Sequence, residues 1–342
     1  MLAAVYYNNK DVRIVDMPKP EIGEDEFLLK VMASGICGSD VTEWYRVPKA
    51  PVILGHEATG TIEKTGSKVT KFKVGDRVFV SHHVPCNKCR YCLKGHHTAC
   101  ETLHNTNYYP GGFAQYIRVP RINVEQGTYK LPAKMSFEDG TFIEPLACVV
   151  RGQRLAGITK NSTLLIIGSG LSGLLHLKLA KLKGTQKKIA CDVNPYRLEG
   201  ANEFGADYVI NAKENVPQKL KENNEGRLAD HVVVCTGATQ AALTALECVD
   251  KGGTILYFAV PDPTFKIPLP ITQFWRSEIT IKTSYGAAPT DLNESFSLLA
   301  QKKVAVSDMI SHRLSIRQAA EGFRLTAEAD KSLKVILEPN NE

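Results

Sequence analysis

Four cysteines with the spacing C-x-x-C-x-x-C-x7-C are the residues of this chain best suited to chemistry: Cys86, Cys89, Cys92 and Cys100. Thiolates at such a spacing can surround one Zn²⁺ tetrahedrally. A zinc with four protein ligands has no position left for a substrate, so we interpret this cluster as a structural site. Any reactive centre must therefore lie elsewhere in the chain.

A second set of possible metal ligands lies outside the cluster: Cys37, His56, Glu57 and Glu144. A thiolate, an imidazole and a carboxylate are the groups that hold a catalytic zinc with one open position. Each also has a plainer interpretation, since Cys37 could be a buried thiol, His56 a structural histidine, and Glu144 a favourable charge at a helix start. The residues alone leave this choice open. We expect Cys148 to be a core residue and the pairs His82-His83 and His96-His97 to be solvated.

The segment Gly168–Gly173 has the form G-x-G-x-x-G between a predicted strand and a predicted helix, and Asp192 ends the next strand. Such a turn lets a pyrophosphate rest on the helix N-terminus. Asp192 can accept hydrogen bonds from ribose hydroxyls and would repel a 2′-phosphate, which favours NAD over NADP. Arg197 could contact adenine or a phosphate, so NADP is not excluded. The predicted cofactor-binding residues are Gly168, Gly170, Leu171, Ser172, Gly173, Asp192, Arg197 and Thr236.

The elements that must position these residues fall into two regions. Residues 1 to about 130 contain short apolar or alternating runs separated by Gly/Pro turns, which predicts a β-rich region. A helix is expected over 136–155, and from there strands and helices alternate: strand 162–167, helix 171–182, strand 188–191. This alternation is typical of a parallel sheet covered on both faces.

The length of 342 residues fits two domains. The net charge of +6 comes from interspersed charges, which is not the pattern of a nucleic-acid-binding surface. The N-terminus lacks a signal-peptide layout, and no apolar run is long enough to span a membrane. Nine cysteines without a secretion signal favour a reducing compartment, so we expect a cytoplasmic protein.

Several motifs together resemble one family. They are Cys37-Gly38-Ser39-Asp40, Gly55-His56-Glu57, Val74-Gly75-Asp76-Arg77-Val78, Gly111-Gly112-Phe113-Ala114 and Glu144-Pro145-Leu146, with the four cysteines and the glycine turn. Their order is that of zinc-dependent medium-chain dehydrogenases, and the chain looks most like the polyol (sorbitol-type) and threonine dehydrogenase branch over essentially its whole length. The resemblance implies a GroES-like β domain over 1–150 and 286–342, with a zinc lobe at about 84–104, and a Rossmann domain over 151–285. It also implies that the strand 333–337 returns to the first domain.

The resemblance further implies roles for the second set of ligands. Cys37 and His56 match the catalytic zinc ligands, Glu57 can enter the coordination sphere, and Glu144 holds the metal directly or through water. Which glutamate is the direct ligand stays open. Asp40 matches an acid that orients the histidine, and Ser39 a hydroxyl that takes the substrate proton.

Two positions depart from the family pattern. Thr42 stands where many relatives carry a histidine, so the proton must leave by another route. Ser284 stands where sorbitol-type members carry an arginine, which puts sorbitol itself in doubt. Trp44 and Tyr285 are candidate walls of the substrate pocket.

We therefore expect zinc-dependent, NAD-linked oxidation of a secondary alcohol, such as a polyol or cyclitol, to a ketone. The expected protein holds two zinc ions per chain, one catalytic and one structural, and is a homodimer or homotetramer. A threonine or amino-alcohol dehydrogenase of the same family is the nearest alternative. A zinc-free reductase would leave Cys37 and His56 without a role, and a nucleic-acid-binding zinc module would not use the glycine turn.

Overall fold

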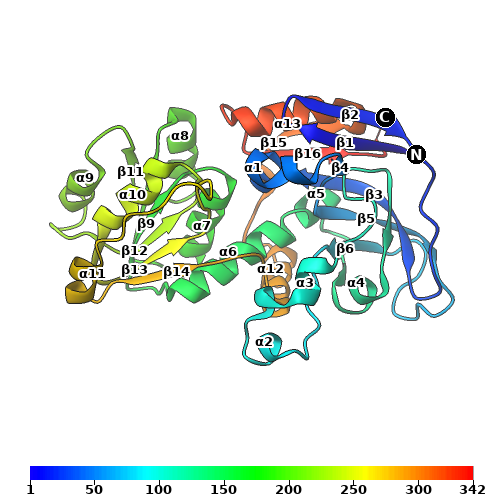
Figure 1. The fold of residues 1–342 in the computed structure, drawn as a ribbon, viewed down its shortest axis with the longest axis horizontal. Helices are drawn as coiled ribbons and strands as arrows, with labels where there is room; N and C mark the ends of the chain where they lie inside the picture. Colours follow the sequence, from blue (N-terminus) through cyan, green and yellow to red (C-terminus); the bar gives the residue numbers. More distant parts are fainter. Residues whose placement is uncertain (342) are drawn as a thin grey trace. The chain divides into compact units, whose positions relative to one another are not determined.

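The computed structural model describes residues 1–341, which form two compact units (Figure 1). The β unit comprises Met1–Ala147 and the segment from Ala287 on, and the parallel-sheet unit comprises Cys148–Gly286. The predicted boundaries, 1–150 with 286–342 and 151–285, differ from these by at most three residues.

The β unit contains a seven-stranded sheet of order β15-β16-β3-β5-β6-β8, with β7 also paired to β3, and a three-stranded sheet β2-β1-β4. Its strands are β1 (Leu2–Asn8), β2 (Asp11–Asp16), β3 (Phe27–Ile36), β4 (Val52–Ile53), β5 (Glu57–Thr65), β6 (Arg77–Ser81), β7 (Tyr116–Val119), β8 (Thr128–Lys130), β15 (Ile310–Ser315) and β16 (Lys334–Glu338). Its helices are α1 (Glu43–Arg46), α2 (Arg90–Leu93), α3 (Glu101–Asn105), α4 (Arg121–Gln126), α5 (Phe137–Gly140), α12 (Pro289–Ala300) and α13 (Ala319–Glu328).

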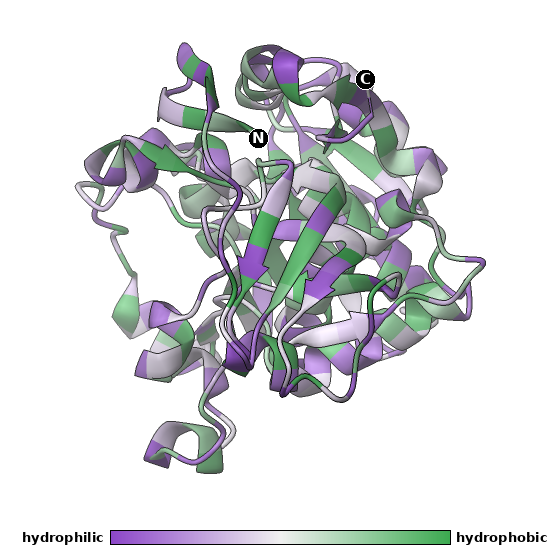
Figure 2. Cartoon of the chain, turned by 90° about the vertical axis from the view of Figure 1, so that its right-hand side faces the viewer, coloured by the Kyte–Doolittle hydropathy of each residue, from purple (hydrophilic) through white to green (hydrophobic). Residues whose placement is uncertain are grey.

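Strand β3 is the centre of this unit, because it pairs antiparallel with β5, β7 and β16. Its residues are mostly buried, with Phe27, Leu29 and Val31 in the core. On the strands that face the viewer in Figure 2, hydrophobic and hydrophilic residues are interleaved, as expected for strands with one face in a core.

The C-terminal segment returns to the β unit, where the resemblance placed the final strand. Strand β16 pairs with β3 so that Ile336 lies opposite Gly35. Residues from the last ten positions of the chain are thereby brought beside the end of β3, which leads directly into Cys37.

The parallel-sheet unit has six parallel strands in the order β11-β10-β9-β12-β13-β14. Its strands are β9 (Thr163–Ile167), β10 (Lys187–Asp192), β11 (Tyr208–Asn211), β12 (Ala229–Val234), β13 (Val249–Tyr257) and β14 (Thr280–Thr283). Its helices are α7 (Leu171–Leu182), α8 (Pro195–Glu203), α9 (Val216–Glu222), α10 (Thr239–Cys248) and α11 (Ile271–Ser277).

Numbered from β9, this order is 3-2-1-4-5-6, the Rossmann topology, and its topological switch point lies between β9 and β12. All residues of β9 are buried, since helices cover both faces of a parallel sheet. The strand orders agree with the predicted fold class, a β domain followed by a Rossmann domain.

One predicted element is wrong. The helix expected over 136–155 is two helices, α5 and α6 (Ile143–Ala156), interrupted at Thr141. The Thr141 hydroxyl donates a hydrogen bond to the Glu138 carbonyl, and Gly140 is a poor helix former, so the first helix ends there. Among residues 1–341, no helix has the length and apolarity needed to cross a membrane.

Candidate metal centre and cofactor turn

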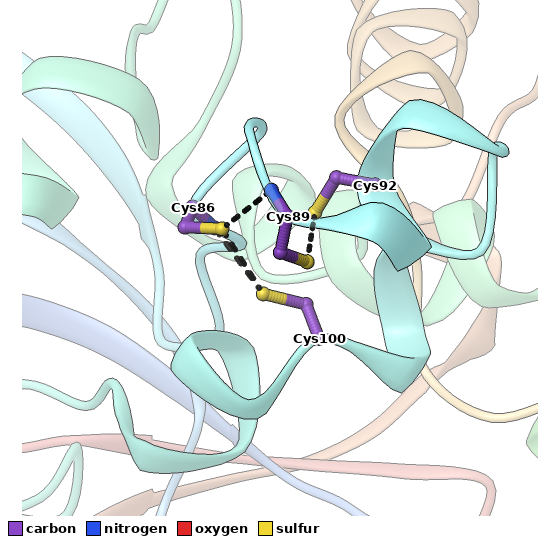
Figure 3. Close-up of side chains that lie close together, drawn as sticks. All are labelled: Cys86, Cys89, Cys92 and Cys100. Atoms are coloured by element: carbon purple, nitrogen blue, oxygen red, sulfur yellow. Dashed lines mark hydrogen bonds between the residues drawn. The ribbon is translucent and has the colours of Figure 1, made fainter.

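The four clustered cysteines meet in one lobe (Figure 3), where their sulfur atoms all lie within 4.8 Å of one another. The Sγ atoms of Cys89 and Cys92 are 3.5 Å apart, and those of Cys86 and Cys100 are 3.6 Å apart. A tetrahedron with zinc–sulfur bonds of about 2.3 Å has edges of roughly 3.8 Å, so the four sulfurs fit a zinc ion. None of the nine cysteines, all of which lie within residues 1–341, forms a disulfide, so no disulfide competes for this cluster.

Backbone N–H groups in the lobe donate hydrogen bonds to cysteine sulfur atoms, which stabilises thiolates. The Cys89 N–H donates to the Cys86 Sγ over 3.3 Å, and the Cys86 N–H donates to the Cys100 Sγ over 3.4 Å. Burial acts to raise the pKa of Cys100, but hydrogen bonds from the backbone of Cys86 and Leu103 outweigh it and lower this pKa to about 6. A thiol that ionises this readily suits a cation ligand.

The second candidate centre joins three residues of the β unit: Cys37, His56 and Glu57. Their ligand atoms lie within 4.8 Å of one another. Cys37 directly follows β3, and His56 directly precedes β5, whose first residue, Glu57, pairs with Gly35. The register between two neighbouring strands therefore brings together the ends that carry the ligands.

Glu57 supplies the clearest sign that this cluster suits a cation. Its side chain is fully buried, and its Oε1 has no hydrogen-bond partner within residues 1–341. Buried carboxylate oxygens are normally paired, and an unpaired one beside a thiol and an imidazole fits a zinc ion.

Glu144 lies in the first turn of α6 and is 9 % exposed. It is not among the three residues whose ligand atoms lie within 4.8 Å of one another, yet its charge acts on Glu57. Burial raises the pKa of Glu57 and Glu144 raises it further, whereas Lys334 and His56 lower it. A divalent cation would relieve the repulsion between the two carboxylates.

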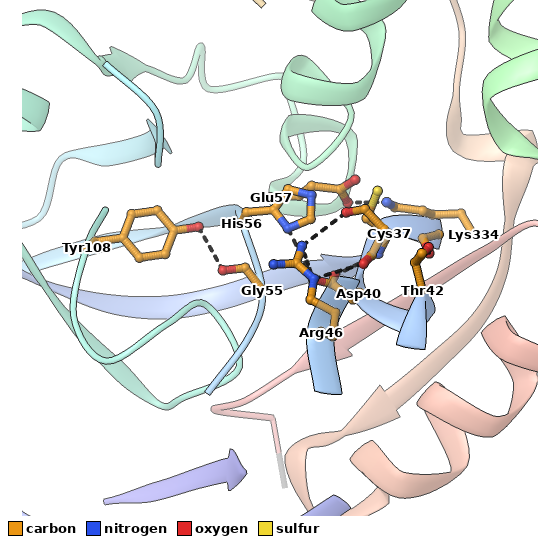
Figure 4. A network of polar contacts seen from close by, with 11 residues as sticks. Cys37, Asp40, Thr42, Arg46, Gly55, His56, Glu57, Tyr108 and Lys334 are labelled. Carbon is orange, nitrogen blue, oxygen red and sulfur yellow. Dashed lines mark hydrogen bonds and ion pairs between the residues drawn. The ribbon is translucent and has the colours of Figure 1, made fainter. Parts of the chain in front are cut away.

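Asp40 is fully buried and faces both ligands (Figure 4). Its Oδ1 lies 3.3 Å from the Nδ1 of His56, and its Oδ2 accepts the Cys37 N–H over 3.1 Å. Burial opposes the charge on His56, but Asp40 and then Cys37 raise the pKa of this imidazole well above its usual value. Because Nδ1 faces Asp40, Nε2 is the nitrogen available to a metal.

Arg46 is a residue of this network that the sequence analysis did not identify. Its Nε donates to the Ser39 carbonyl over 2.8 Å, and its Nη2 lies 3.2 Å from the Ser39 Oγ and 3.4 Å from the Asp40 Oδ1. Arg46 ends the short helix α1, where an arginine has many possible partners, so the sequence carried no signal beyond its closeness to Cys37.

Lys334 was also missed. Its ammonium group forms an ion pair with the Glu57 Oε2, and both side chains are completely buried. The two residues are 277 positions apart, and only the pairing of β16 with β3 brings them together.

Other predicted residues of this region have simpler surroundings. The Thr42 hydroxyl donates to the Gly38 carbonyl, a local contact. Trp44 is 41 % exposed and Tyr285 is 46 % exposed, and their assignment to a substrate pocket stays a prediction.

The expectation that His82 and His83 are solvated is wrong. The His82 ring packs against His56 and His83, with ring centroids 4.9 and 3.8 Å apart. Strand β6 ends at Ser81, so the chain turns toward the cysteine lobe directly beside His56. Burial and nearby cationic groups lower the pKa of His82 well below its usual value and that of His83 to about 3. His96 is exposed, as expected.

The glycine turn of the parallel-sheet unit connects β9 to α7. Gly168 has φ +97°, a conformation that glycine adopts without strain. A Cβ on Gly173 would lie 2.1 Å from the Gly168 carbonyl oxygen, so only glycine allows α7 to start this close to the strand. The turn therefore fits a pyrophosphate at the N-terminus of α7.

Asp192, the last residue of β10, is nearly buried under this turn. Its Oδ2 accepts the Ser169 N–H over 2.7 Å, and its Oδ1 accepts the Asn194 N–H over 2.9 Å. Arg197 lies 3.9 Å from the same carboxylate, and the Thr236 side chain lies beside Gly168. Asp192 thus positions the turn as well as being the predicted partner of the ribose.

Comparisons with known proteins agree with this architecture. Residues 23–132 match the family described as "Alcohol dehydrogenase GroES-like domain", and residues 173–301 match "Zinc-binding dehydrogenase". The chain is 31 % identical to the sorbitol dehydrogenase of Gallus gallus, covering 98 % of this chain and 96 % of that protein. It is 33 % identical to "Probable D-xylulose reductase A" of Aspergillus fumigatus, covering 95 % and 93 %.

A solved structure from Sinorhizobium meliloti 1021, a protein bound to NADP, is also similar. It has a TM-score of 0.88 and 27 % identity, covering 99 % of each chain. The two family matches and the long alignments with polyol dehydrogenases establish the relationship. The chain belongs to the zinc-dependent medium-chain dehydrogenase/reductase family, in its polyol dehydrogenase branch, and is an oxidoreductase that uses zinc and a nicotinamide cofactor.

Proposed function

We propose that the protein oxidises a secondary alcohol to a ketone with NAD at a zinc ion held by Cys37, His56 and Glu57. The observation that carries this proposal is the buried, unpaired oxygen of Glu57 beside a thiol and an imidazole. Glu144 supplies further negative charge and is a ligand directly or through water. The cysteine lobe holds a second, structural zinc.

When bound, the two groups would supply complementary chemistry: zinc would act as a Lewis acid that makes the alcohol easier to deprotonate, and NAD⁺ would accept the hydride. In balance, the alcohol and NAD⁺ give the ketone, NADH and one proton. The chain itself must therefore hold the metal ligands still and remove this proton. Asp40 performs the first task, since it contacts both His56 and the backbone of Cys37.

Ser39 accepts the proton in this proposal. Arg46 donates to its Oγ, which leaves the serine O–H and one lone pair free to exchange a proton with the substrate hydroxyl. Thr42 is engaged with the Gly38 carbonyl, so the proton passes from Ser39 to water and not along a histidine relay.

NAD is the proposed cofactor because Asp192 brings a carboxylate to the end of β10, where a 2′-phosphate would be repelled. The similar Sinorhizobium meliloti structure contains NADP, and Arg197 beside Asp192 is a cation that could receive a phosphate. A direct comparison of NAD with NADP decides between them.

The proposed substrate is a polyol or cyclitol, in line with the sorbitol dehydrogenase and xylulose reductase relatives. Because Ser284 replaces the expected arginine, sorbitol need not be the preferred substrate. Threonine-type amino alcohols are the second candidate, on the strength of the resemblance.

We further propose a cytoplasmic homodimer or homotetramer. All four residues of the edge strand β14 are exposed, and nearby Trp275 is 77 % exposed. An unpaired sheet edge with apolar neighbours favours association with another copy.

The test is a panel of polyols, cyclitols and amino alcohols offered to the zinc-loaded protein with NAD or NADP, followed at the absorbance of the reduced nicotinamide. Turnover of a hydroxylated substrate with NAD, lost on removal of zinc, supports the proposal. Full turnover by protein that lacks the zinc of Cys37 and His56 would contradict it.

A further inference from the structure

Glu57 has two neighbours that can carry positive charge, Lys334 and His56. The ion pair with Lys334 limits how the carboxylate of Glu57 can bind a metal. Its Oε2 is held by Lys334, and its Oε1 is the oxygen without a partner. The same carboxylate belongs to the cluster that contains the ligand atoms of Cys37 and His56. One oxygen is therefore engaged on the lysine side while the other is left for the metal side.

The lysine is fixed as firmly as the carboxylate. Its side chain is completely buried, and its Nζ lies 5.6 Å from the centroid of the Phe142 ring. Strand β16 carries it, and the pairing of Ile336 with Gly35 sets its position. The ammonium group of Lys334 therefore cannot rotate into water.

Gly35 makes the room for this ion pair. A Cβ at this position would lie 2.0 Å from the Glu57 Oε2 and 2.5 Å from the Lys334 Nζ. Gly35 pairs with Glu57 on one side of β3 and with Ile336 on the other. Strand β3 therefore has no side chain at the place where those of Glu57 and Lys334 meet.

Burying an ion pair is costly, and breaking one leaves an uncompensated charge. If Lys334 served only the packing of β16, an apolar residue would fill this space at lower cost. Its position on one oxygen of a candidate metal ligand suggests a different use.

We propose that Lys334 is a positioning residue that restrains Glu57, so that the carboxylate reaches the zinc ion with one oxygen at most and can withdraw. This restraint keeps a coordination position open for the substrate. The proposal rests on the proposed function, because it needs a zinc ion at Cys37 and His56.

The test measures zinc release to a chromophoric chelator from the wild-type protein and from Lys334→Met, which keeps chain length but removes the charge. Without its lysine partner, the buried Glu57 has the metal as its remaining cation, so we expect this zinc to leave about tenfold more slowly. Release of two zinc ions is expected to give two kinetic phases. The phase that is absent from the Cys37→Ser variant belongs to the zinc at Cys37 and His56, and the other phase belongs to the zinc of the cysteine lobe.

Cobalt substitution gives a second readout. With Co²⁺ in place of zinc, the visible absorption of Lys334→Met should weaken, because the added carboxylate oxygen changes a four-coordinate site toward five-coordinate. Lys334→Arg, which keeps the charge, should retain the wild-type spectrum and release rate.

Two further variants make the test specific. Lys188→Met is the matched control, since Lys188 is also a nearly buried lysine paired with a carboxylate, that of Asp207, and it belongs to the parallel-sheet unit. It should release zinc at the wild-type rate. In the double variant Lys334→Met/Glu57→Gln, the slow release should disappear, because it requires the Glu57 carboxylate.

Unchanged or faster release from folded Lys334→Met would overturn the restraint. If this variant does not fold, Glu57→Gln alone decides: it should release zinc faster than wild type, and an unchanged rate would show that Glu57 does not reach the metal. A wild-type chain with only one zinc would instead overturn the proposed function itself, whatever Lys334 does.

Discussion

The Oδ1 of Asp40 lies 3.3 Å from the Nδ1 of His56, and both side chains are shielded from solvent. This contact fixes the orientation of an imidazole whose other nitrogen faces Cys37 and Glu57. Carboxylates in this position are important for metal sites, because they set the tautomer and raise the basicity of the ligand.

Asp40→Asn should therefore weaken zinc binding or turnover by about 10–100-fold while the fold is kept. The amide can still contact His56, but it lacks the charge that favours the correct tautomer. Zinc affinity by competitive chelation and kcat with the best substrate are the measurements. Asp76→Asn is a suitable control, because Asp76 also accepts a backbone N–H and forms an ion pair, here with Lys130, but is not part of the ligand cluster. Equal effects of both variants would argue against a special role for Asp40.

Cys100→Ser should remove one zinc per chain and lower the melting temperature, while part of the activity is retained. Cys100 accepts the N–H of Cys86 and completes the four-sulfur lobe, which has no open position for a substrate. Metal analysis and calorimetry test this. Cys235→Ser, in the parallel-sheet unit, should keep both zinc ions. Complete loss of activity in Cys100→Ser with a full complement of zinc would contradict the structural role.

Asp192→Asn should reduce the preference for NAD over NADP by roughly tenfold, or about 1.4 kcal/mol, as expected from removing one charge near a 2′-phosphate. The ratio of kcat/KM for the two cofactors is the measurement. Asp230→Asn is the control, because Asp230 also accepts a backbone N–H, that of Thr163, in the same sheet. An unchanged cofactor ratio in Asp192→Asn would show that this carboxylate serves only the glycine turn.

Acid should destabilise the protein through His176. This side chain is completely buried in α7, and burial lowers its pKa to about 3. Between that value and about 6.5, the unfolded chain binds a proton that the folded chain does not, so stability falls as the pH falls below 6.5. The contribution is about 1.4 kcal/mol per pH unit, or about 2 kcal/mol between pH 6.5 and 5.

His176→Leu should remove this part of the pH dependence, whereas exposed His96→Ala should keep it. Urea unfolding at pH 7 and pH 5 gives the comparison. The same loss of stability at pH 5 in wild type and His176→Leu would mean that His176 is protonated in the folded protein.

The parts of this protein that could be predicted from sequence are those whose residues lie close together in the chain. The turn at Gly168 and Gly173 and the end of β10 at Asp192 follow from short patterns, since each glycine is required by local backbone geometry. The cysteine lobe is equally local.

Contacts over long sequence separations could not be predicted in this way. Lys334 and Glu57 meet only through the register of β16 with β3. Neither segment contains a sequence pattern that indicates its partner. His82 is a similar case, because it packs against His56 only through the pairing of β6 with β5, in which Ser81 lies opposite Glu57. The contact of Arg46 with Asp40 is local, six residues apart, but a short helix offers an arginine several possible partners. The resemblance to a family predicted that Cys37, His56 and Glu57 lie together, but it did not predict these neighbours.

Zinc content with turnover, measured on the wild-type protein and on Cys37→Ser, tests the catalytic centre most directly. The wild type should hold two zinc ions per chain, and Cys37→Ser should hold one, remain folded and lose NAD-linked alcohol oxidation. A Cys37→Ser protein with two zinc ions and full turnover would contradict the assignment.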